Sequence, residues 1–273
     1  MDWDDAYANA PYIPGAEAYP DRWASEAAAF RDRLQGAGRA RLGVSYGPSE
    51  RQAYDLFLPE GAARGTCVFV HGGYWLKFHR SYWSHFAAGP LARGWAVAMP
   101  SYDLCPDVGI AEITRQIARA VTAIAQTRNG PLALAGHSAG GHLVARMAHA
   151  GLSKAVKTRI TRVVPISPVS DLRPLINTAM NADFRLSEDS AAAESPALMA
   201  APDWPVTVWV GGDERPVFLD QARWLAQAWG AGHVIDRGRH HFDVIDALRD
   251  PDSALVEALL SADGQQPGKA RLA

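Results

Sequence analysis

Short apolar runs alternate with longer amphipathic stretches along most of the chain. In residues 40–46 and 53–58, polar and apolar side chains exchange at every second position, which is typical of a half-buried antiparallel strand pair. Further along, the apolar runs become continuous, as in parallel strands that are covered on both faces. They comprise residues 66–70, 95–99, 132–135, 163–166 and 206–210, with a more polar run at 234–236. This order predicts a mostly parallel sheet with an antiparallel beginning.

Amphipathic stretches with the period of a helix separate these runs. They comprise residues 22–34, 80–93, 110–127, 139–150, 215–229 and 253–260. Strands that alternate with helices in this way are typical of βαβ units, whose helices cover both faces of one sheet. The sequence therefore predicts an α/β fold.

The same pattern predicts a single domain, residues 39–262, rather than two. Residues 1–38 mix acidic and aromatic side chains with prolines and end in the first helix, so we expect an arm that packs on the core. Residues 168–205 hold no strand-like run, and we expect a small cap insertion above the sheet there. Residues 263–273 are polar, and we expect a flexible tail.

Composition narrows the class of function. The 273 residues include 27 Lys and Arg against 29 Asp and Glu, so there is no basic field to hold a nucleic acid. Cys67 and Cys105 are too few for a disulfide framework or a zinc cluster, and we interpret them as structural thiols in a reducing compartment. The first residues are acidic, and no apolar run approaches the ~18 residues of a membrane span. We expect a cytoplasmic protein with a small-molecule substrate and no membrane partner, and a homodimer is compatible with this.

The sequence Gly-His-Ser-Ala-Gly at residues 136–140 lies between a predicted buried strand and a predicted helix. A sharp turn from strand to helix strains its central residue and tolerates only small neighbours, which explains a glycine two positions before and two positions after. The turn presents the Ser138 hydroxyl at a helix N-terminus, where free N–H groups favour negative charge. Ser138 is therefore the candidate nucleophile, and the alternative is an ordinary glycine-rich turn.

A second glycine motif follows an earlier strand. It reads His71-Gly72-Gly73-Tyr74-Trp75. Adjacent glycines allow the backbone to approach a substrate closely and to point N–H groups at one spot, as an oxyanion hole requires. The expected donors are the N–H groups of Gly73 and Tyr74, together with that of Ala139 after the nucleophile. Taken alone, the motif is equally compatible with a plain turn.

A serine nucleophile needs a base, and histidine is the usual one. After Ser138, two histidines lie on the helix that begins at the motif and one opens a strand. His240 and His241 follow the last predicted strand, where a loop at the carboxyl end of the sheet belongs. We favour His241 as the base, with His240 as the alternative.

The base in turn needs a carboxylate that fixes its tautomer. The strand at residues 206–210 is followed by Gly-Gly-Asp-Glu, and a carboxylate at this end of a strand can reach the same crevice as Ser138. Asp213 is the first choice, and Glu214 is its near competitor. Three other acidic residues are expected to be solvated or to cap turns, namely Asp236, Asp243 and Asp246.

The motifs of the sequence give no support for a metal site or a cofactor site. The nine histidines form no HExxH pair, and there is no C-x-x-C. Neither G-x-G-x-x-G after the first strand nor G-x-x-x-x-G-K-[ST] is present. We therefore expect no metal and no cofactor.

Together, the two glycine motifs, Asp213 and the sequence His241-Phe242-Asp243 resemble the α/β-hydrolase fold over residues 46–260. Within that superfamily the chain looks like the arylformamidase (kynurenine formamidase) group, whose members carry H-G-G-x-W where lipase-like esterases carry H-G-G-G. The resemblance implies a cofactor-free serine hydrolase that converts N-formyl-L-kynurenine to L-kynurenine and formate. Carried over by position, Ser138 would be the nucleophile, Asp213 the acid and His241 the base.

Two other functions remain open at the level of sequence. H-G-G-x-W also occurs in similar esterases and thioesterases, so a general carboxylesterase for small acyl or aryl esters is the first alternative. A hydrolase-fold binding protein with an idle triad is the remote one. Aromatic residues after the strands either line an aryl site or pack under the insertion. The candidate substrate-binding residues are Tyr74, Trp75, Phe78, Tyr102 and His137.

Overall fold

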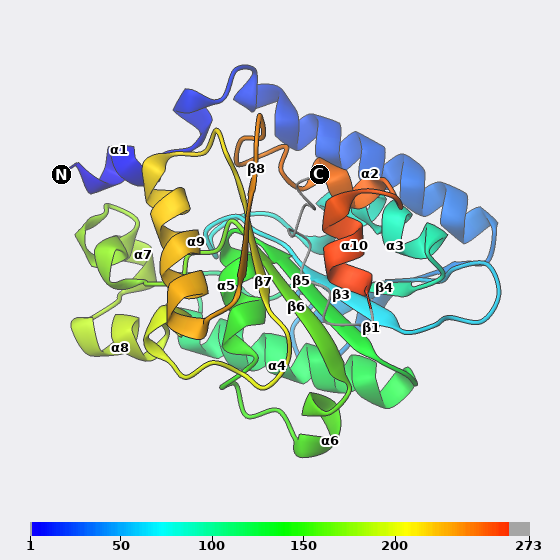
Figure 1. Ribbon diagram of the computed structural model, residues 1–273. Helices are drawn as coiled ribbons and strands as arrows, with labels where there is room; N and C mark the ends of the chain where they lie inside the picture. Colours follow the sequence, from blue (N-terminus) through cyan, green and yellow to red (C-terminus); the bar gives the residue numbers. More distant parts are fainter. Residues whose placement is uncertain (1, 262–273) are drawn as a thin grey trace, which may run out of the picture.

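The computed structural model describes residues 2–261, and at its centre lies a sheet of eight strands in the order β1-β2-β4-β3-β5-β6-β7-β8 (Figure 1). β1 pairs antiparallel with β2 and β2 with β4, whereas the later pairs are parallel. The strands comprise β1 (Ala40–Ser45), β2 (Ala53–Phe57), β3 (Thr66–Val70), β4 (Ala96–Pro100), β5 (Leu132–His137), β6 (Ile160–Ile166), β7 (Thr207–Gly211) and β8 (Gly232–Asp236). The predicted mostly parallel sheet with an antiparallel beginning is confirmed.

Helices cover both faces of this sheet. Side chains of a strand alternate between the faces, so Val68 and Val70 of β3 belong to one apolar core and Cys67 and Phe69 to the other. The first face is covered by α4 (Ile110–Thr127), α5 (Ala139–Arg146) and α9 (Pro216–Trp229). The second is covered by α2 (Tyr19–Gly36), α3 (Ala88–Ala92) and α10 (Ala254–Leu260). The continuous apolar runs in the sequence reflect this burial on both sides.

The prediction of one continuous helix at residues 80–93 is wrong. Residues 80–93 do not form a continuous helix but the two 3₁₀ turns η3 (Arg80–Tyr82) and η4 (Ser84–Ala87), followed by α3. Pro90 has no N–H to donate to the carbonyl of Phe86, which a continuous α-helix would require. Gly89 also lies so close to the carbonyl of Leu248 that a Cβ there would be 2.5 Å from its oxygen. The close contact between Gly89 and Leu248, which lies before α10, and the missing N–H of Pro90 therefore explain why this segment is not one continuous helix.

Residues 167–206, between β6 and β7, are all described by the structure, and they form short helices and no strand of the sheet. These are η5 (Arg173–Asn177), α7 (Asn181–Phe184), α8 (Glu188–Ala193) and η6 (Pro196–Leu198). Glu194 fastens the segment to the helical layer, because its buried carboxylate accepts hydrogen bonds from Arg146 Nε at 3.0 Å and Thr114 Oγ1 at 2.7 Å. The short α6 (Lys154–Lys157) lies between α5 and β6.

The arm before the sheet is folded into helices and turns. It begins with α1 (Trp3–Tyr7), passes through the 3₁₀ turns η1 (Ala10–Tyr12) and η2 (Ala16–Ala18), and continues into α2. The tail expected at residues 263–273 lies outside the described residues. Among the helices of the described part of the chain, none combines the length and apolar character needed to cross a membrane.

Strand register brings the two glycine motifs together. Val70 of β3 pairs with Gly136 of β5, so the loop that begins at His71 leaves the sheet beside the turn that holds Ser138. Because β3, β5, β6, β7 and β8 run parallel, the loops after their carboxyl ends meet at one edge of the sheet. That edge is where the chemistry predicted from the sequence has to lie.

Candidate active site

The turn around Ser138 has the strained geometry that the motif predicts. Ser138 has φ 57° and ψ −118°, and its N–H donates to the carbonyl of Ile166 at 2.8 Å. A Cβ on Gly136 would lie 2.1 Å from the carbonyl oxygen of Gly140. A Cβ on Gly140 would lie 2.0 Å from the carbonyl oxygen of Val70. The two glycines let β3, β5 and α5 approach closely enough to hold Ser138 in this conformation.

Replacing Gly140 by alanine is expected to lower the free energy of unfolding by about 3 kcal/mol, because the added methyl meets backbone that cannot move aside. For a domain of this size, that loss lowers the midpoint of thermal unfolding by roughly 6–12 °C. Gly36→Ala is the matched control, since nothing lies within 4 Å of a Cβ at this helical glycine. Equal midpoints for the two variants in a calorimetric scan would contradict the close packing at Gly140.

The His-Gly-Gly loop lies directly against this turn. A Cβ on Gly72 would be 3.0 Å from the Cβ of Ser138, so only glycine allows the contact. Gly73, Tyr74 and Trp75 have φ values of 113°, 53° and 58°, which turn the backbone through the left-handed region. Within residues 2–261, the N–H groups of Gly73 and Tyr74 donate to no carbonyl or side chain. Free N–H groups beside a nucleophile are what an oxyanion requires.

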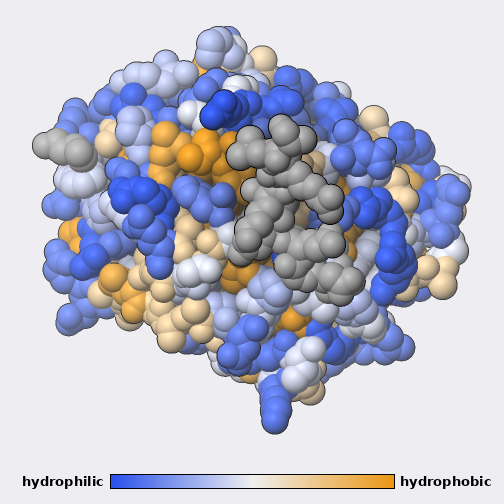
Figure 2. Space-filling view, in the orientation of Figure 1, coloured by the Kyte–Doolittle hydropathy of each residue, from blue (hydrophilic) through white to orange (hydrophobic). Residues whose placement is uncertain are grey.

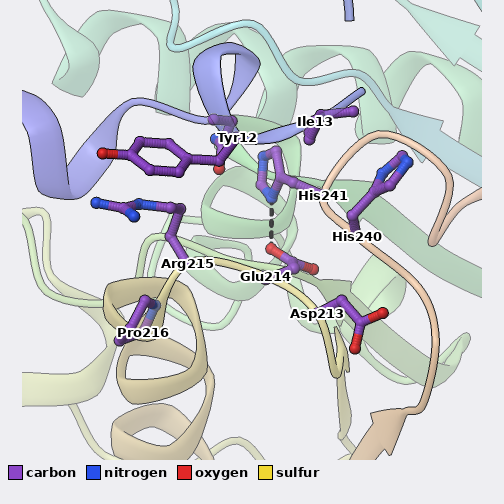
Figure 3. Close-up of a pocket in the computed structure, with 9 residues that line it drawn as sticks. Tyr12, Ile13, Asp213, Glu214, Arg215, Pro216, His240 and His241 are labelled. Carbon is purple, nitrogen blue, oxygen red and sulfur yellow. Dashed lines mark hydrogen bonds and ion pairs between the residues drawn. The ribbon is translucent and has the colours of Figure 1, made fainter. Parts of the chain in front are cut away.

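His241 is paired with Glu214 and not with Asp213. The distance from His241 Nδ1 to Glu214 Oε2 is 2.6 Å (Figure 3). The Glu214 side chain is completely buried, and its Oε1 accepts hydrogen bonds from the N–H of Gly211 at 2.8 Å and from the hydroxyl of Ser167. Both of these hydrogen bonds end on Oε1, so Oε2 is left for the imidazole.

The first choice of acid in the sequence analysis, Asp213, is therefore contradicted by the geometry. Its side chain is exposed and points away from His241 (Figure 3). After β7 the chain turns tightly against the loop that follows β8. A Cβ on Gly211 would be 2.3 Å from the carbonyl oxygen of Arg239 in that loop. The N–H of Asp213 donates to the same oxygen at 2.9 Å. This turn directs residue 213 outward and residue 214 inward.

His240, the alternative base, has a structural role in the loop. Its Nδ1 accepts from the N–H groups of Phe242 and Asp243 at 3.1 and 3.2 Å. Its Nε2 lies 3.1 Å from the hydroxyl of Tyr19 in α2. His240 therefore holds the loop to the arm, and His241 is the histidine that faces a buried carboxylate.

Two rings flank His241. The ring of His137 lies 4.7 Å from that of His241, and Phe218 of α9 lies 4.3 Å from it. His137 Nε2 donates to the carbonyl of His241 at 2.8 Å. Burial and the neighbouring His241 hold the pKa of His137 well below its usual range, so this ring stays neutral. His137, a candidate substrate-binding residue, thus holds the backbone of His241 and packs against its ring.

The aromatic residues proposed for an aryl site are mostly packed inside the protein. Trp75 is completely buried, and its ring meets those of His142 and Phe184 edge-on at 5.1 and 5.7 Å. Tyr102 is also completely buried, stacks 4.5 Å from the ring of His71, and donates to the His71 carbonyl. This is the packing interpretation, and it excludes both rings from the surface of a pocket in this structure.

Phe78 and Tyr74 are half-buried. Phe78 packs against Trp23 and Trp83, with ring centroids 6.0 and 5.5 Å away, so it belongs to the second core. Tyr74 instead turns its hydroxyl toward Tyr7 of α1. Tyr74 also accepts a hydrogen bond from Asn9, which lines the pocket described next.

A pocket of about 260 Å³ lies beside His241. It is formed by the N-terminal arm, by the residues around the start of α9, and by the loop after β8 (Figure 3). The lining residues are Asn9, Tyr12, Ile13, Asp213, Glu214, Arg215, Pro216, His240 and His241. Sequence reasoning missed the arm residues, because no motif marks them. In residues 2–261 no group of three or more His, Cys, Asp or Glu side chains is arranged to hold a metal ion.

Comparison with known proteins gives a consistent classification. The family described as alpha/beta hydrolase fold matches residues 67–231. Kynurenine formamidase of Salmo salar is 27% identical over 252 residues, which cover 86% of this chain and 85% of that protein. The Drosophila melanogaster kynurenine formamidase is 31% identical over 228 residues, covering 74% and 75% respectively.

Among solved structures, a Silicibacter sp. TM1040 protein that carries the provisional name thioesterase is 59% identical, with a TM-score of 0.93 over 96% of this chain and 100% of that one. Esterase B from a Lactobacillus species is 18% identical with a TM-score of 0.61 and shares the fold. The family match spans more than half of the chain, including both glycine motifs and Glu214. The chain therefore belongs to the alpha/beta hydrolase fold family and is a hydrolase with distant homology to the kynurenine formamidases.

Proposed function

We propose that the protein is a serine hydrolase with Ser138 as nucleophile, His241 as base and Glu214 as acid. The observation that carries the proposal is the 2.6 Å contact between His241 and the buried Glu214, at the sheet edge where the strained Ser138 turn lies. A carboxylate on Nδ1 fixes the tautomer in which Nε2 is free to take a proton. A serine hydroxyl needs this assistance at neutral pH.

The reaction proceeds through an acyl-enzyme. Ser138 Oγ forms a bond to the substrate's carbonyl carbon while its proton passes to His241 Nε2, and the carbonyl electron pair moves onto the oxygen. The N–H groups of Gly73, Tyr74 and Ala139 stabilise that oxyanion. When the tetrahedral intermediate collapses, the bond to the leaving group breaks and His241 protonates the leaving atom. Water then attacks the ester on Ser138 with His241 again as base, releasing the acid.

The substrate we propose is N-formyl-L-kynurenine, which would give L-kynurenine and formate. Support comes from the kynurenine formamidases at 27–31% identity, which align over most of this chain. A thioester or small ester is the second candidate, supported by the 59% identical protein with the provisional name thioesterase. All three reactions use the same catalytic groups, since they differ only in whether nitrogen, oxygen or sulfur leaves.

A substrate panel separates these candidates. We expect kcat/KM for N-formyl-L-kynurenine to exceed that for p-nitrophenyl acetate, p-nitrophenyl butyrate and acetyl-coenzyme A, each by at least about tenfold, which corresponds to ~1.4 kcal/mol of differential transition-state binding. Activated p-nitrophenyl esters are intrinsically more reactive than a formamide. A higher kcat/KM for the formamide would therefore come from its binding to the enzyme. An ester or the thioester that wins by a similar margin would reject the formamidase assignment and leave the serine mechanism in place.

A further inference from the structure

The N-terminal arm is fastened across the site by contacts that span most of the sequence. Arg215, next to Glu214, donates through Nη2 to Asp5 Oδ2 at 2.7 Å. Its guanidinium carbon lies 3.5 Å from the centre of the Tyr12 ring, and the Tyr12 hydroxyl donates to Asp5. Asp4 accepts the N–H of Ala179 at 2.7 Å. The arm is thus clasped to the start of α9 and to the segment between β6 and β7.

The arm also contacts the loop that is proposed to hold the oxyanion. The Tyr74 hydroxyl donates to the carbonyl of Tyr7 and accepts from Asn9 Nδ2 at 3.0 Å. Tyr7 itself is buried, and its hydroxyl accepts from Gln221 of α9 at 2.7 Å. A chain of hydrogen bonds therefore connects α9, the arm and the side chain of Tyr74. The position of the arm is fixed by the same elements that carry the catalytic groups.

Three arm residues line the pocket together with His241. Tyr12 and Ile13 lie on the side of the pocket opposite Asp213 and Pro216 (Figure 3). Asn9 also lines the pocket and is almost fully buried. On the outer surface the arm lies beside α9 (Figure 1), and hydrophilic residues cover most of the face of the molecule seen in Figure 2. The pocket is therefore a space between the arm and the base.

The chemistry determines which half of a substrate this space receives. In an acyl transfer, His241 must protonate the leaving atom, whereas the carbonyl oxygen lies against the His-Gly-Gly loop. The leaving group therefore extends toward His241, which lines the pocket. Ser138 itself is not among the lining residues, but Asn9 in the lining donates to the hydroxyl of Tyr74, so the pocket is connected to the His-Gly-Gly loop as well as to His241. A volume of about 260 Å³ exceeds the ~150 Å³ that encloses a benzene ring. One substituted aromatic ring fits this volume, whereas two full rings, at ~150 Å³ each, would exceed it.

We propose that Tyr12 and Ile13, with Asn9, form the wall that selects the leaving group, and that this wall favours leaving groups with a single aromatic ring. The inference rests on the proposed serine hydrolase function and adds to it which residues set specificity, and for which half of the substrate. The acyl group is selected elsewhere, so changes in the wall alter leaving-group preference without altering acyl preference.

The test varies each half of the substrate separately in the full-length protein. The leaving-group ratio compares kcat/KM for 4-biphenylyl acetate with that for phenyl acetate, and the acyl ratio compares p-nitrophenyl butyrate with p-nitrophenyl acetate. In Tyr12→Ala we expect the leaving-group ratio to rise about tenfold and the acyl ratio to change less than about twofold. Leu198→Ala is the matched control, because Leu198 also ends a 3₁₀ turn, is 49% exposed against 51% for Tyr12, and lies outside the pocket.

Tyr12→Phe separates the effect of the Tyr12 ring in the wall from the effect of its hydrogen bond to Asp5, because phenylalanine keeps the ring and removes that bond. We expect it to keep the wild-type leaving-group ratio. An unchanged leaving-group ratio in Tyr12→Ala, or a larger change in the acyl ratio, would overturn the proposal. Loss of phenyl acetate turnover in Ser138→Ala tests the serine mechanism independently, so failure of the wall and failure of the proposed function give different results.

Discussion

Ser138→Ala is expected to lower kcat for phenyl acetate by about 10⁵- to 10⁶-fold, which is the size of loss found when a serine hydrolase loses its nucleophile. Alanine removes the atom that forms the acyl-enzyme and keeps the turn, because a small side chain suits the strained conformation at φ 57°. The remaining activity comes from the oxyanion donors and from substrate binding. The thermal unfolding midpoint is expected to stay close to that of the unmodified protein.

Two measurements decide this prediction. Turnover is followed with phenyl acetate, and a fluorophosphonate probe reports a covalent bond to the nucleophile. Ser84→Ala serves as the control, because Ser84 is also fully buried and its hydroxyl accepts from Arg31 at 3.0 Å in another part of the core. We expect Ser84→Ala to be labelled and Ser138→Ala to remain unlabelled. Turnover by Ser138→Ala at the level of the control would remove the serine mechanism, and a folded but unlabelled unmodified protein would favour a binding function.

The fold was predictable because its determinants are local. A parallel strand covered on both faces needs an unbroken apolar run, and such a run can be read from residues such as 66–70 without any knowledge of its partners. The nucleophile turn and the His-Gly-Gly loop are local in the same sense, since the close approaches at Gly72 and Gly140 exclude a side chain. Where tertiary contact overrides local preference, as between Gly89 and Leu248, the prediction of a continuous helix failed.

The wall of the pocket and the carboxylate that pairs with His241 could not be predicted in this way. Asp5 and Arg215 are 210 residues apart, and no periodicity or motif connects them. Asp213 and Glu214 are adjacent carboxylates after the same strand, so strand placement alone does not distinguish them. The direction of each depends on how the turn at Gly211 packs on Arg239, which belongs to a different loop. The sequence did hold one indication in favour of Glu214, because the longer Glu side chain reaches further from a tight turn. The direction in which that side chain points, however, depends on tertiary packing.

Glu214→Gln is expected to lower kcat by about 10³- to 10⁴-fold, whereas Asp213→Asn is expected to change it less than about threefold. Glutamine keeps the size of Glu214 but carries no charge, so it neither holds the His241 tautomer nor stabilises the imidazolium that forms in the transition state. Asparagine at residue 213 makes the same chemical change one position earlier, on an exposed side chain that does not contact His241.

This pair of variants compares the two carboxylates under identical chemistry. Both are measured with phenyl acetate, and thermal unfolding of each variant separates a catalytic loss from a folding defect. Glu214→Asp supplies a further readout, because it keeps the charge and shortens the side chain by one methylene, so we expect it to retain more activity than Glu214→Gln. If Asp213→Asn shows the larger loss, the acid is Asp213 and the loop after β7 adopts another conformation during catalysis. A large loss in Glu214→Gln alone means that the buried contact of 2.6 Å is the one that orients the base.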